Sequence, residues 1–195
     1  NNPRSGEKFV QTDLQLYAAI TDQLIIKTVD ELEELCPTKR SVLQNYEDVY
    51  EDNRKSLNNL FNQLLLLDYA VKSIISKSSH DNIVFCRDDI LIKKRILTNC
   101  VLAKANEIIV PGFHWHKGYN DRFMFGTKEV AILWAGRITH LNKFYHKQKY
   151  LTGEKLVKSI LDESNITILS FPRVFPRIRH NDYICKERNT MSINR

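Results

Sequence analysis

The chain has 195 residues, of which 43% are hydrophobic and 27% are charged. This composition is typical of a folded globular protein and excludes a chain that is disordered throughout. The longest unbroken aliphatic run, from Leu64 to Leu67, is far shorter than the roughly 20 apolar residues that a membrane-spanning helix needs. No basic-then-apolar signal segment opens the sequence, so we expect a protein of the cytoplasm or nucleus with no membrane partner.

The net charge of +6 is distributed unevenly along the chain. Residues 1–90 contain 10 Lys and Arg against 15 Asp and Glu, a net charge of −5, whereas residues 91–195 contain 19 against 8, a net charge of +11. An excess of this size in one half is typical of a protein that binds a polyanion such as nucleic acid, or an acidic protein surface. The alternative is that the basic half docks on the acidic half of the same chain.

The motifs that identify common catalytic and cofactor sites are missing from the sequence. The cysteines, Cys36, Cys86, Cys100 and Cys185, form no C-x-x-C pair and no close pair, which predicts reduced thiols rather than a zinc knuckle. Neither G-x-x-x-x-G-K nor G-x-G-x-x-G occurs, and G-x-S-x-G is also missing. We therefore predict no cofactor, no nucleotide hydrolysis and no nucleophilic catalysis.

The first part of the chain reads as an arm over 1–11 followed by an acidic helical hairpin over 12–77. Thr12 with Gln15, and Thr28 with Glu31, have the spacing of capping boxes at helix starts. Pro37 is expected to end the first element, because the residue before a proline is driven away from helical geometry.

A long amphipathic helix is predicted from Ser41 to about Ser76. Its apolar residues recur in steps of four and three, which is the pattern of a coiled-coil seam with one polar position, Asn53. This helix either packs into the core of its own chain or pairs with a second copy to form a homo-oligomer. The seam residues are Tyr50, Leu57, Leu60, Leu64, Leu67, Val71 and Ile74.

Beyond a polar boundary at 78–82, a smaller basic mixed module is expected over 83–195, either as a separate domain or packed with the hairpin. A short strand is predicted over 83–86, followed by a helix over 88–105 or, alternatively, a strand over 90–96. Thr127 is expected to cap a helix over 128–147 whose outer basic face includes Arg137, His140 and Lys143. The remaining predictions are a helix capped by Thr152, a strand over 165–171 and a hairpin turning at 180–182. Together these elements predict a mostly helical α+β fold.

Cations and aromatic rings alternate through the basic half of the chain. Lysines and arginines neutralise phosphates, and exposed rings stack on unpaired bases. The sequence therefore predicts a non-enzymatic protein that binds RNA or single strands within a larger assembly. The residues expected to contact phosphate are Lys143, Lys147, Lys149, Arg173, Arg177 and Arg179, and those expected to stack are Trp115, Tyr119 and Phe175.

A protein-interaction subunit is the alternative function, with the helical hairpin and a basic docking surface as its interfaces. A third hypothesis is a metal-dependent enzyme, because His114 and His116 would share one face of an extended segment and Asp121 could complete the ligand set. The spacing of these three residues, followed by Gly126, resembles the first metal motif of the cupin family. That resemblance would imply a strand-rich barrel, whereas long helical stretches surround the motif.

Overall fold

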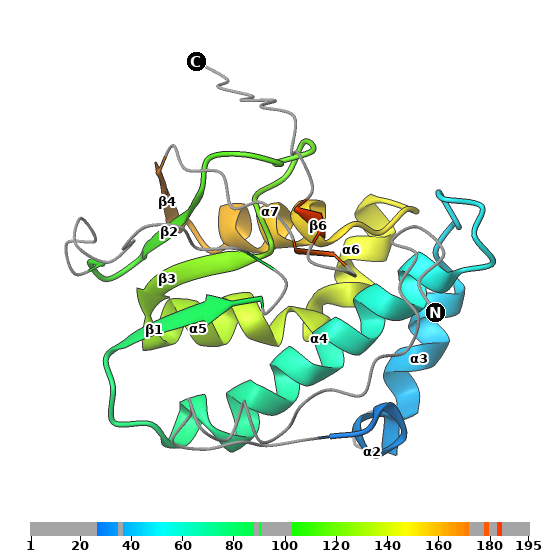
Figure 1. Ribbon diagram of the computed structural model, residues 1–195, viewed down its shortest axis with the longest axis horizontal. Helices are drawn as coiled ribbons and strands as arrows, with labels where there is room; N and C mark the ends of the chain where they lie inside the picture. The colour runs from blue at the N-terminus through cyan, green and yellow to red at the C-terminus, as the bar shows by residue number, and fades with distance from the viewer. Residues whose placement is uncertain are drawn as a thin grey trace.

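The structure is a computed structural model, and it describes residues 27–34, 37–87, 90, 103–171, 178–179 and 183–184. These residues form helices and a four-stranded mixed sheet, so the α+β class is confirmed for the part of the chain described (Figure 1). The predicted arm and the first part of the hairpin lie outside these residues. None of the helices within them is long and apolar enough to cross a membrane.

The helices come in two groups along the chain. The first group is α2 (Val29–Glu34), α3 (Pro37–Gln44) and α4 (Lys55–Ser73), with the 3-10 turn η1 (Ile75–Lys77) after α4. The second group is α5 (Lys128–Ala135), the 3-10 segment η3 (Gly136–His140), α6 (Leu141–Lys147) and α7 (Gly153–Glu163). The predicted helix over 128–147 is therefore present, but as three successive segments.

The sheet has the strand order β1-β3-β2-β4. Its strands are β1 (Asn82–Cys86), β2 (Glu107–Pro111), β3 (Phe123–Thr127) and β4 (Thr167–Phe171). β3 pairs antiparallel with β1 and β2, whereas β4 lies parallel to β2. The parallel pair requires a crossover, and α5, η3, α6 and α7 supply it. The predicted strands at 83–86 and 165–171 are confirmed, and so is the C-terminal hairpin, as β5 (Ile178–Arg179) paired with β6 (Tyr183–Ile184).

α5 packs against β1 and β3 and also against α4, which gives the order sheet, α5, α4 seen in Figure 1. One core joins α2, α3 and α4 to η3, α6 and α7, and a second joins the end of α4 to the sheet, α5 and α7. Side chains from both sides of the predicted boundary at 78–82 therefore share both cores. Tyr46 shows how close the contact is, since its hydroxyl donates to the Leu141 carbonyl oxygen at 2.6 Å.

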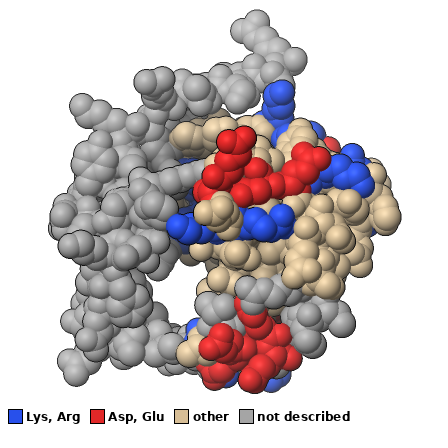
Figure 2. All heavy atoms as spheres, turned by 90° about the vertical axis from the view of Figure 1, so that its right-hand side faces the viewer, with Lys and Arg blue, Asp and Glu red and all other residues tan. Residues whose placement is uncertain are grey.

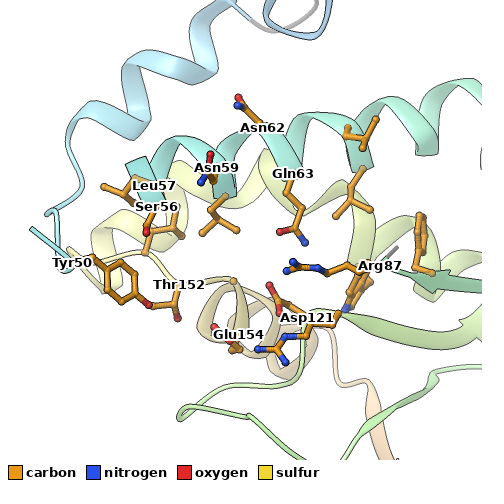
Figure 3. A pocket seen from close by; sticks show the side chains of 18 of the residues that line it. Tyr50, Ser56, Leu57, Asn59, Asn62, Gln63, Arg87, Asp121, Thr152 and Glu154 are labelled. Carbon is orange, nitrogen blue, oxygen red and sulfur yellow. The ribbon is translucent and has the colours of Figure 1, made fainter. Parts of the chain in front are cut away.

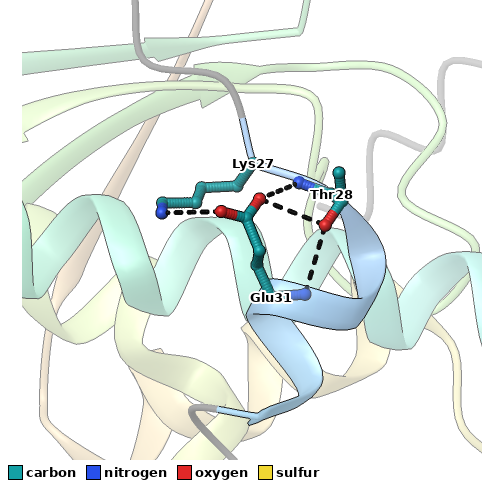
Figure 4. Close-up of polar contacts among 3 residues, drawn as sticks. All are labelled: Lys27, Thr28 and Glu31. Carbon is teal, nitrogen blue, oxygen red and sulfur yellow. Dashed lines mark hydrogen bonds and ion pairs between the residues drawn. The ribbon is translucent and has the colours of Figure 1, made fainter.

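The predicted capping box at Thr28 and Glu31 is confirmed (Figure 4). The Glu31 backbone N–H donates to the Thr28 hydroxyl at 3.2 Å, and the Thr28 N–H donates to the Glu31 carboxylate at 2.7 Å. Lys27 adds an ion pair to the same carboxylate at 3.2 Å. These contacts lower the pKa of Glu31, the backbone hydrogen bond from Thr28 being the largest cause.

The predicted continuous helix from Ser41 to Ser76 is wrong, because residues 45–54 form a turn between α3 and α4. Glu51, Asn53 and Arg54 have φ values of 50°, 55° and 62°, which a right-handed helix does not allow. The Asp48 carboxylate accepts from the Arg54 N–H at 2.8 Å, so an aspartate satisfies the backbone outside a helix. α2 ends at Glu34, before Pro37, and Pro37 is the first residue of α3, a position where its missing N–H has no cost.

The apolar seam of α4 packs mostly inside its own chain. Leu57, Leu64 and Val71 are buried in the two cores, whereas Tyr50 and Ile74 are exposed. Asn53 lies in the turn before α4 and so takes no part in a helical seam.

Charges of both signs share the face seen in Figure 2. Asp and Glu side chains gather there in two groups, the lower one at the height of α2, and Lys and Arg side chains lie beside them. The described residues of this face therefore offer no continuous basic surface to a polyanion.

Candidate functional site

A cavity of about 830 Å³ lies between α4 and the N-terminal end of α7 (Figure 3). Its volume is in the range of small-molecule sites. Gln63 from α4 and Arg87 from the end of β1 point into it from opposite sides. Two carboxylates, Asp121 and Glu154, line the wall opposite α4.

Asp121 and Arg122 reach the cavity because the loop between β2 and β3 is closed by a buried amide. The Asn120 side chain donates to the Phe113 carbonyl oxygen at 3.0 Å and accepts from the Arg122 N–H at 3.0 Å. The Arg87 N–H then donates to the Arg122 carbonyl oxygen at 3.0 Å, which joins the end of β1 to the same loop. The backbones of the cavity residues Arg87, Asp121 and Arg122 are thus held in place by this loop and its contact with the end of β1.

Two glycines allow this loop to lie directly on the first turn of α7. A Cβ on Gly118 would lie 2.1 Å from the Glu154 carbonyl oxygen, and a Cβ on Gly153 would lie 2.2 Å from Asp121 Oδ2. The Tyr119 N–H donates to the Glu154 carbonyl oxygen at 3.0 Å, which holds the contact. The predicted cap is present, since Thr152 Oγ1 accepts from the Lys155 N–H at 3.4 Å. Asp121 therefore lies against the positive end of the α7 dipole, where a carboxylate is favoured.

Asp121 is buried and Glu154 is partly buried, and neither carboxylate is neutralised by an ion pair with another described residue. Asp121 is 7% exposed, and within the described residues neither Asp121 nor Glu154 forms an ion pair. The pKa of Glu154 is raised from 4.5 to about 7, first by burial and next by the charge of Asp121, against opposite effects of Arg122 and Arg87. Glu154 can therefore gain or lose a proton near neutral pH.

A third guanidinium lies behind the cavity wall. Arg137, predicted on the basic outer face of its helix, is instead fully buried, with its guanidinium carbon 4.0 Å from the centre of the Trp134 ring. Nη1 donates to the Trp134 carbonyl oxygen at 2.8 Å, whereas Nε and Nη2 have no hydrogen-bond partner within the described residues. Burial lowers the pKa of Arg137 to about 10, so it remains a cation that faces the charges of Asp121 and Glu154.

The lysines predicted to contact phosphate lie on and after α6 and are engaged with other side chains. Lys143 and Lys147 both form ion pairs with the Glu163 carboxylate. The Lys149 ammonium lies 3.7 Å from the centre of the Tyr145 ring. Of the remaining predicted cations, Arg173 and Arg177 lie outside the described residues, and Arg179 lies in β5, whose side chains are not described.

The aromatic residues predicted to stack on bases are part of the loop packing. Trp115 Nε1 donates to the Pro111 carbonyl oxygen at 2.8 Å, and the Tyr119 hydroxyl donates to Asp162 at 2.9 Å. The two rings meet edge to face with centres 5.2 Å apart. Phe175 lies outside the described residues.

The predicted metal site is not assembled. His114 Nδ1 and His116 Nε2 lie 3.1 Å apart, but Asp121 turns into the cavity. Across the described ranges no group of three or more His, Cys, Asp or Glu side chains could hold a metal ion. The four-stranded sheet with its helical layers also differs from the strand-rich barrel that the cupin resemblance implied.

Sequence reasoning missed Arg87, Gln63 and Glu154 as site residues. The available signal was the charged pair Asp121–Arg122 directly before the apolar strand β3, together with the Thr-Gly-Glu start of α7. Neither signal indicates a cavity without the fold.

Comparison with protein-family models, curated proteins and solved structures gives no match to this chain.

Proposed function

We propose that the protein binds a small polar molecule in the cavity between α4 and α7. The observation that carries this proposal is the carboxylate pair of the buried Asp121 and the partly buried Glu154, which lines the cavity and forms no ion pair with another described residue. Withdrawing carboxylates from water without a partner costs several kcal/mol. A ligand that meets both groups would recover part of this free energy.

The construction of the site supports the same proposal. Asp121 is held against α7 through Gly153, and the loop that carries it is closed by Asn120. Side chains held in this way lose little entropy when a ligand binds, which raises affinity.

A thermal-shift screen tests the proposal, with a panel of sugars, nucleotides, organic acids, amines, amino acids and short peptides. We expect one class to raise the Tm of the natural protein and of Glu163→Gln, a control at the far end of α7. The same compounds should leave the Tm of Asp121→Asn unchanged. A panel without any stabilising compound would contradict the proposal, as would an Asp121→Asn variant that responds like the natural protein.

A second candidate function is binding of RNA or single strands, within a larger assembly, on the surface of α6 and α7. It is favoured by three contacts between a lysine ammonium of the segment from α6 to α7 and a tyrosine ring, with distances of 3.7, 3.8 and 4.7 Å to the ring centres. Adjacent cations and rings suit a strand with unpaired bases. The pairs are Lys149 with Tyr145, Lys155 with Tyr150 and Lys158 with Tyr119.

Carboxylates limit this second function, since Glu163 and Asp162 already pair with Lys143, Lys147 and Lys158. We therefore expect measurable binding of RNA or single strands mainly at low salt. Fluorescence anisotropy with labelled single strands should show binding that is lost when Lys149, Lys155 and Lys158 are all changed to Glu. Asp121→Asn is the matched control and should bind normally. Unchanged affinity of the triple variant would refute the assignment.

A further inference from the structure

We propose that the ligand of the cavity is a zwitterion of the amino-acid or short-peptide type, with its ammonium group on Asp121 and Glu154 and its carboxylate on Arg87 and Arg122. This inference rests on the proposed ligand-binding function and specifies the chemistry of the molecule bound. Opposite charges line one cavity, and a ligand that carries both charges matches it.

The ammonium group is assigned to the carboxylate pair. Asp121 is 7% exposed, and within the described part of the chain it shares no ion pair with a cation. Glu154 lines the same cavity one residue after Gly153, whose missing side chain lets Asp121 approach. An ammonium group has three donors and can serve two carboxylates at once.

The carboxylate group is assigned to Arg87 and Arg122. Both side chains line the cavity, and their backbones are joined by the hydrogen bond from the Arg87 N–H to the Arg122 carbonyl oxygen. Two guanidiniums from adjacent strand ends suit a carboxylate, which guanidinium groups bind through paired hydrogen bonds.

Ligands that carry only a positive or only a negative charge fit the charged wall formed by Asp121, Glu154, Arg87 and Arg122 less well. A simple amine would face the three guanidiniums of Arg87, Arg122 and the buried Arg137. A simple acid would face the carboxylates of Asp121 and Glu154. Because charges of both signs line one cavity, a dipolar molecule oriented along the wall gains from its attraction to both sets.

The opposite wall suits a peptide bond. Ser56, Asn59 and Gln63 of α4 line the cavity with groups that both donate and accept hydrogen bonds. Apolar side chains also line the cavity, including Trp134 and Leu151. A volume of about 830 Å³ holds more than one amino acid, so a short peptide uses the space better.

Binding of the ammonium group should be linked to loss of a proton from Glu154. Among the described residues, the charged groups that act on Glu154 are Asp121 and Arg122 from the loop, Arg87 directly after β1 and Arg137 from η3, while Lys27 and Glu47 line the same cavity. The α4 residues that line the cavity are uncharged. Since a cation favours the ionised carboxylate, affinity should rise as the pH rises through about 7.

Calorimetry with three forms of one alanine tripeptide tests the inference. The first form has both termini free, the second is acetylated at its N-terminus and the third is amidated at its C-terminus. We expect each blocked form to bind at least about tenfold more weakly than the free form, because each has lost one charge-assisted contact.

Two variants assign the two ends of the peptide. Asp121→Asn should remove the preference for the free over the acetylated form, and Arg122→Gln should remove the preference for the free over the amidated form. These preferences are ratios within one variant, so a general loss of stability does not change them. Equal binding of all three forms to the natural protein would overturn the inference.

The outcomes also separate this inference from the proposed function. If no tripeptide binds while another class in the thermal-shift panel does, the cavity is a ligand site but the zwitterion assignment is wrong. If no compound of any class binds, both proposals fail.

Discussion

The two ends of α7 carry glutamates with opposite behaviour. Glu154, in the first turn, lies against the buried Asp121, and its pKa is raised to about 7. Glu163, in the last turn, accepts from Lys143, Lys147 and Ser159, and its pKa is lowered to about 2. The helix dipole alone would order them the other way, since it stabilises a carboxylate at the N-terminal end. Burial and neighbouring charges therefore outweigh the dipole here.

The difference indicates that Glu154 is positioned to bind a ligand, whereas Glu163 forms ion pairs at the surface. Glu163 has the same chemistry as Glu154 but is neutralised by lysines at the surface, where ion pairs contribute little to stability. Glu154 is partly withdrawn from water beside a like charge, which costs stability in the folded state. A protein retains such a cost mainly where the group acts on another molecule.

The two glutamates also predict opposite effects of pH on stability. The contribution of Glu154 is fully present below about pH 4.5 and is lost as the pH rises through about 7, because its folded-state pKa is raised. The contribution of Glu163 is present above about pH 4.5 and is lost as the pH falls toward 2, because its folded-state pKa is lowered.

The largest effect is expected from Gly118→Ala, which breaks the contact at the first turn of α7. The added Cβ would lie 2.1 Å from the Glu154 carbonyl oxygen and 2.5 Å from the Lys155 nitrogen, and both are backbone atoms that cannot rotate away. We expect a loss of about 3 kcal/mol or more in the free energy of unfolding. Urea denaturation measures it.

Gly136→Ala is the matched control for this substitution. A Cβ at Gly136 would meet no atom within 4 Å, so its stability should change by less than about 1 kcal/mol. Equal destabilisation by the two substitutions would contradict the docking of the loop on α7.

Glu154→Gln is expected to stabilise the protein by about 2 kcal/mol at pH 8. The full rise in the pKa of Glu154 would correspond to more than about 2 kcal/mol, because ionising this carboxyl costs more in the folded than in the unfolded protein. Solvent in the cavity screens the charge, so we expect the smaller value. The gain should shrink as the pH falls toward about 4.5, where the natural carboxyl is protonated. Urea denaturation across this pH range measures the gain, and Glu163→Gln should show no such increase with pH. A gain independent of pH would point to packing instead of charge.

Arg137→Met tests whether the buried guanidinium restrains the pKa of Glu154. Removing this cation should raise the pKa of Glu154 by about one further unit, equivalent to about 1.4 kcal/mol. Carboxyl carbon NMR measures the titration, and Glu163 serves as the internal reference because its partners are Lys143 and Lys147. An unchanged Glu154 titration would remove Arg137 from the electrostatics of the site.

The smallest effect is expected at the C-terminal end of α7. Changing both Lys143 and Lys147 to Gln should raise the pKa of Glu163 toward its ordinary value and cost about 0.5 kcal/mol of stability at low salt. Added salt should reduce this difference, since the ion pairs are at the surface. The same NMR titration should leave Glu154 unaffected, and a shift there would show that the two ends are coupled.

Local patterns predicted several elements correctly. The capping box at Thr28, the cap at Thr152, the helix after it and the strand β4 each depend on neighbouring residues. Strands β2 and β3 were not predicted, because short apolar runs around a glycine-rich loop carry no clear period. The break at 45–54 was missed because the apolar residues around it keep a helical spacing. The break is stabilised by Asp48 and Asp52, whose carboxylates accept from the Arg54 and Ser56 N–H groups.

The sequence by itself determined the α+β class, the caps and the unequal charge of the two halves, because these depend on composition and on contacts a few residues apart. Only the tertiary structure decided that Arg137 is buried and that Lys143 and Lys147 are paired. It also decided that Asp121 and Glu154 share a cavity, because two glycines far apart in the chain allow a loop to lie on the first turn of α7. Close approach of this kind depends on backbones meeting in space, which no local pattern records.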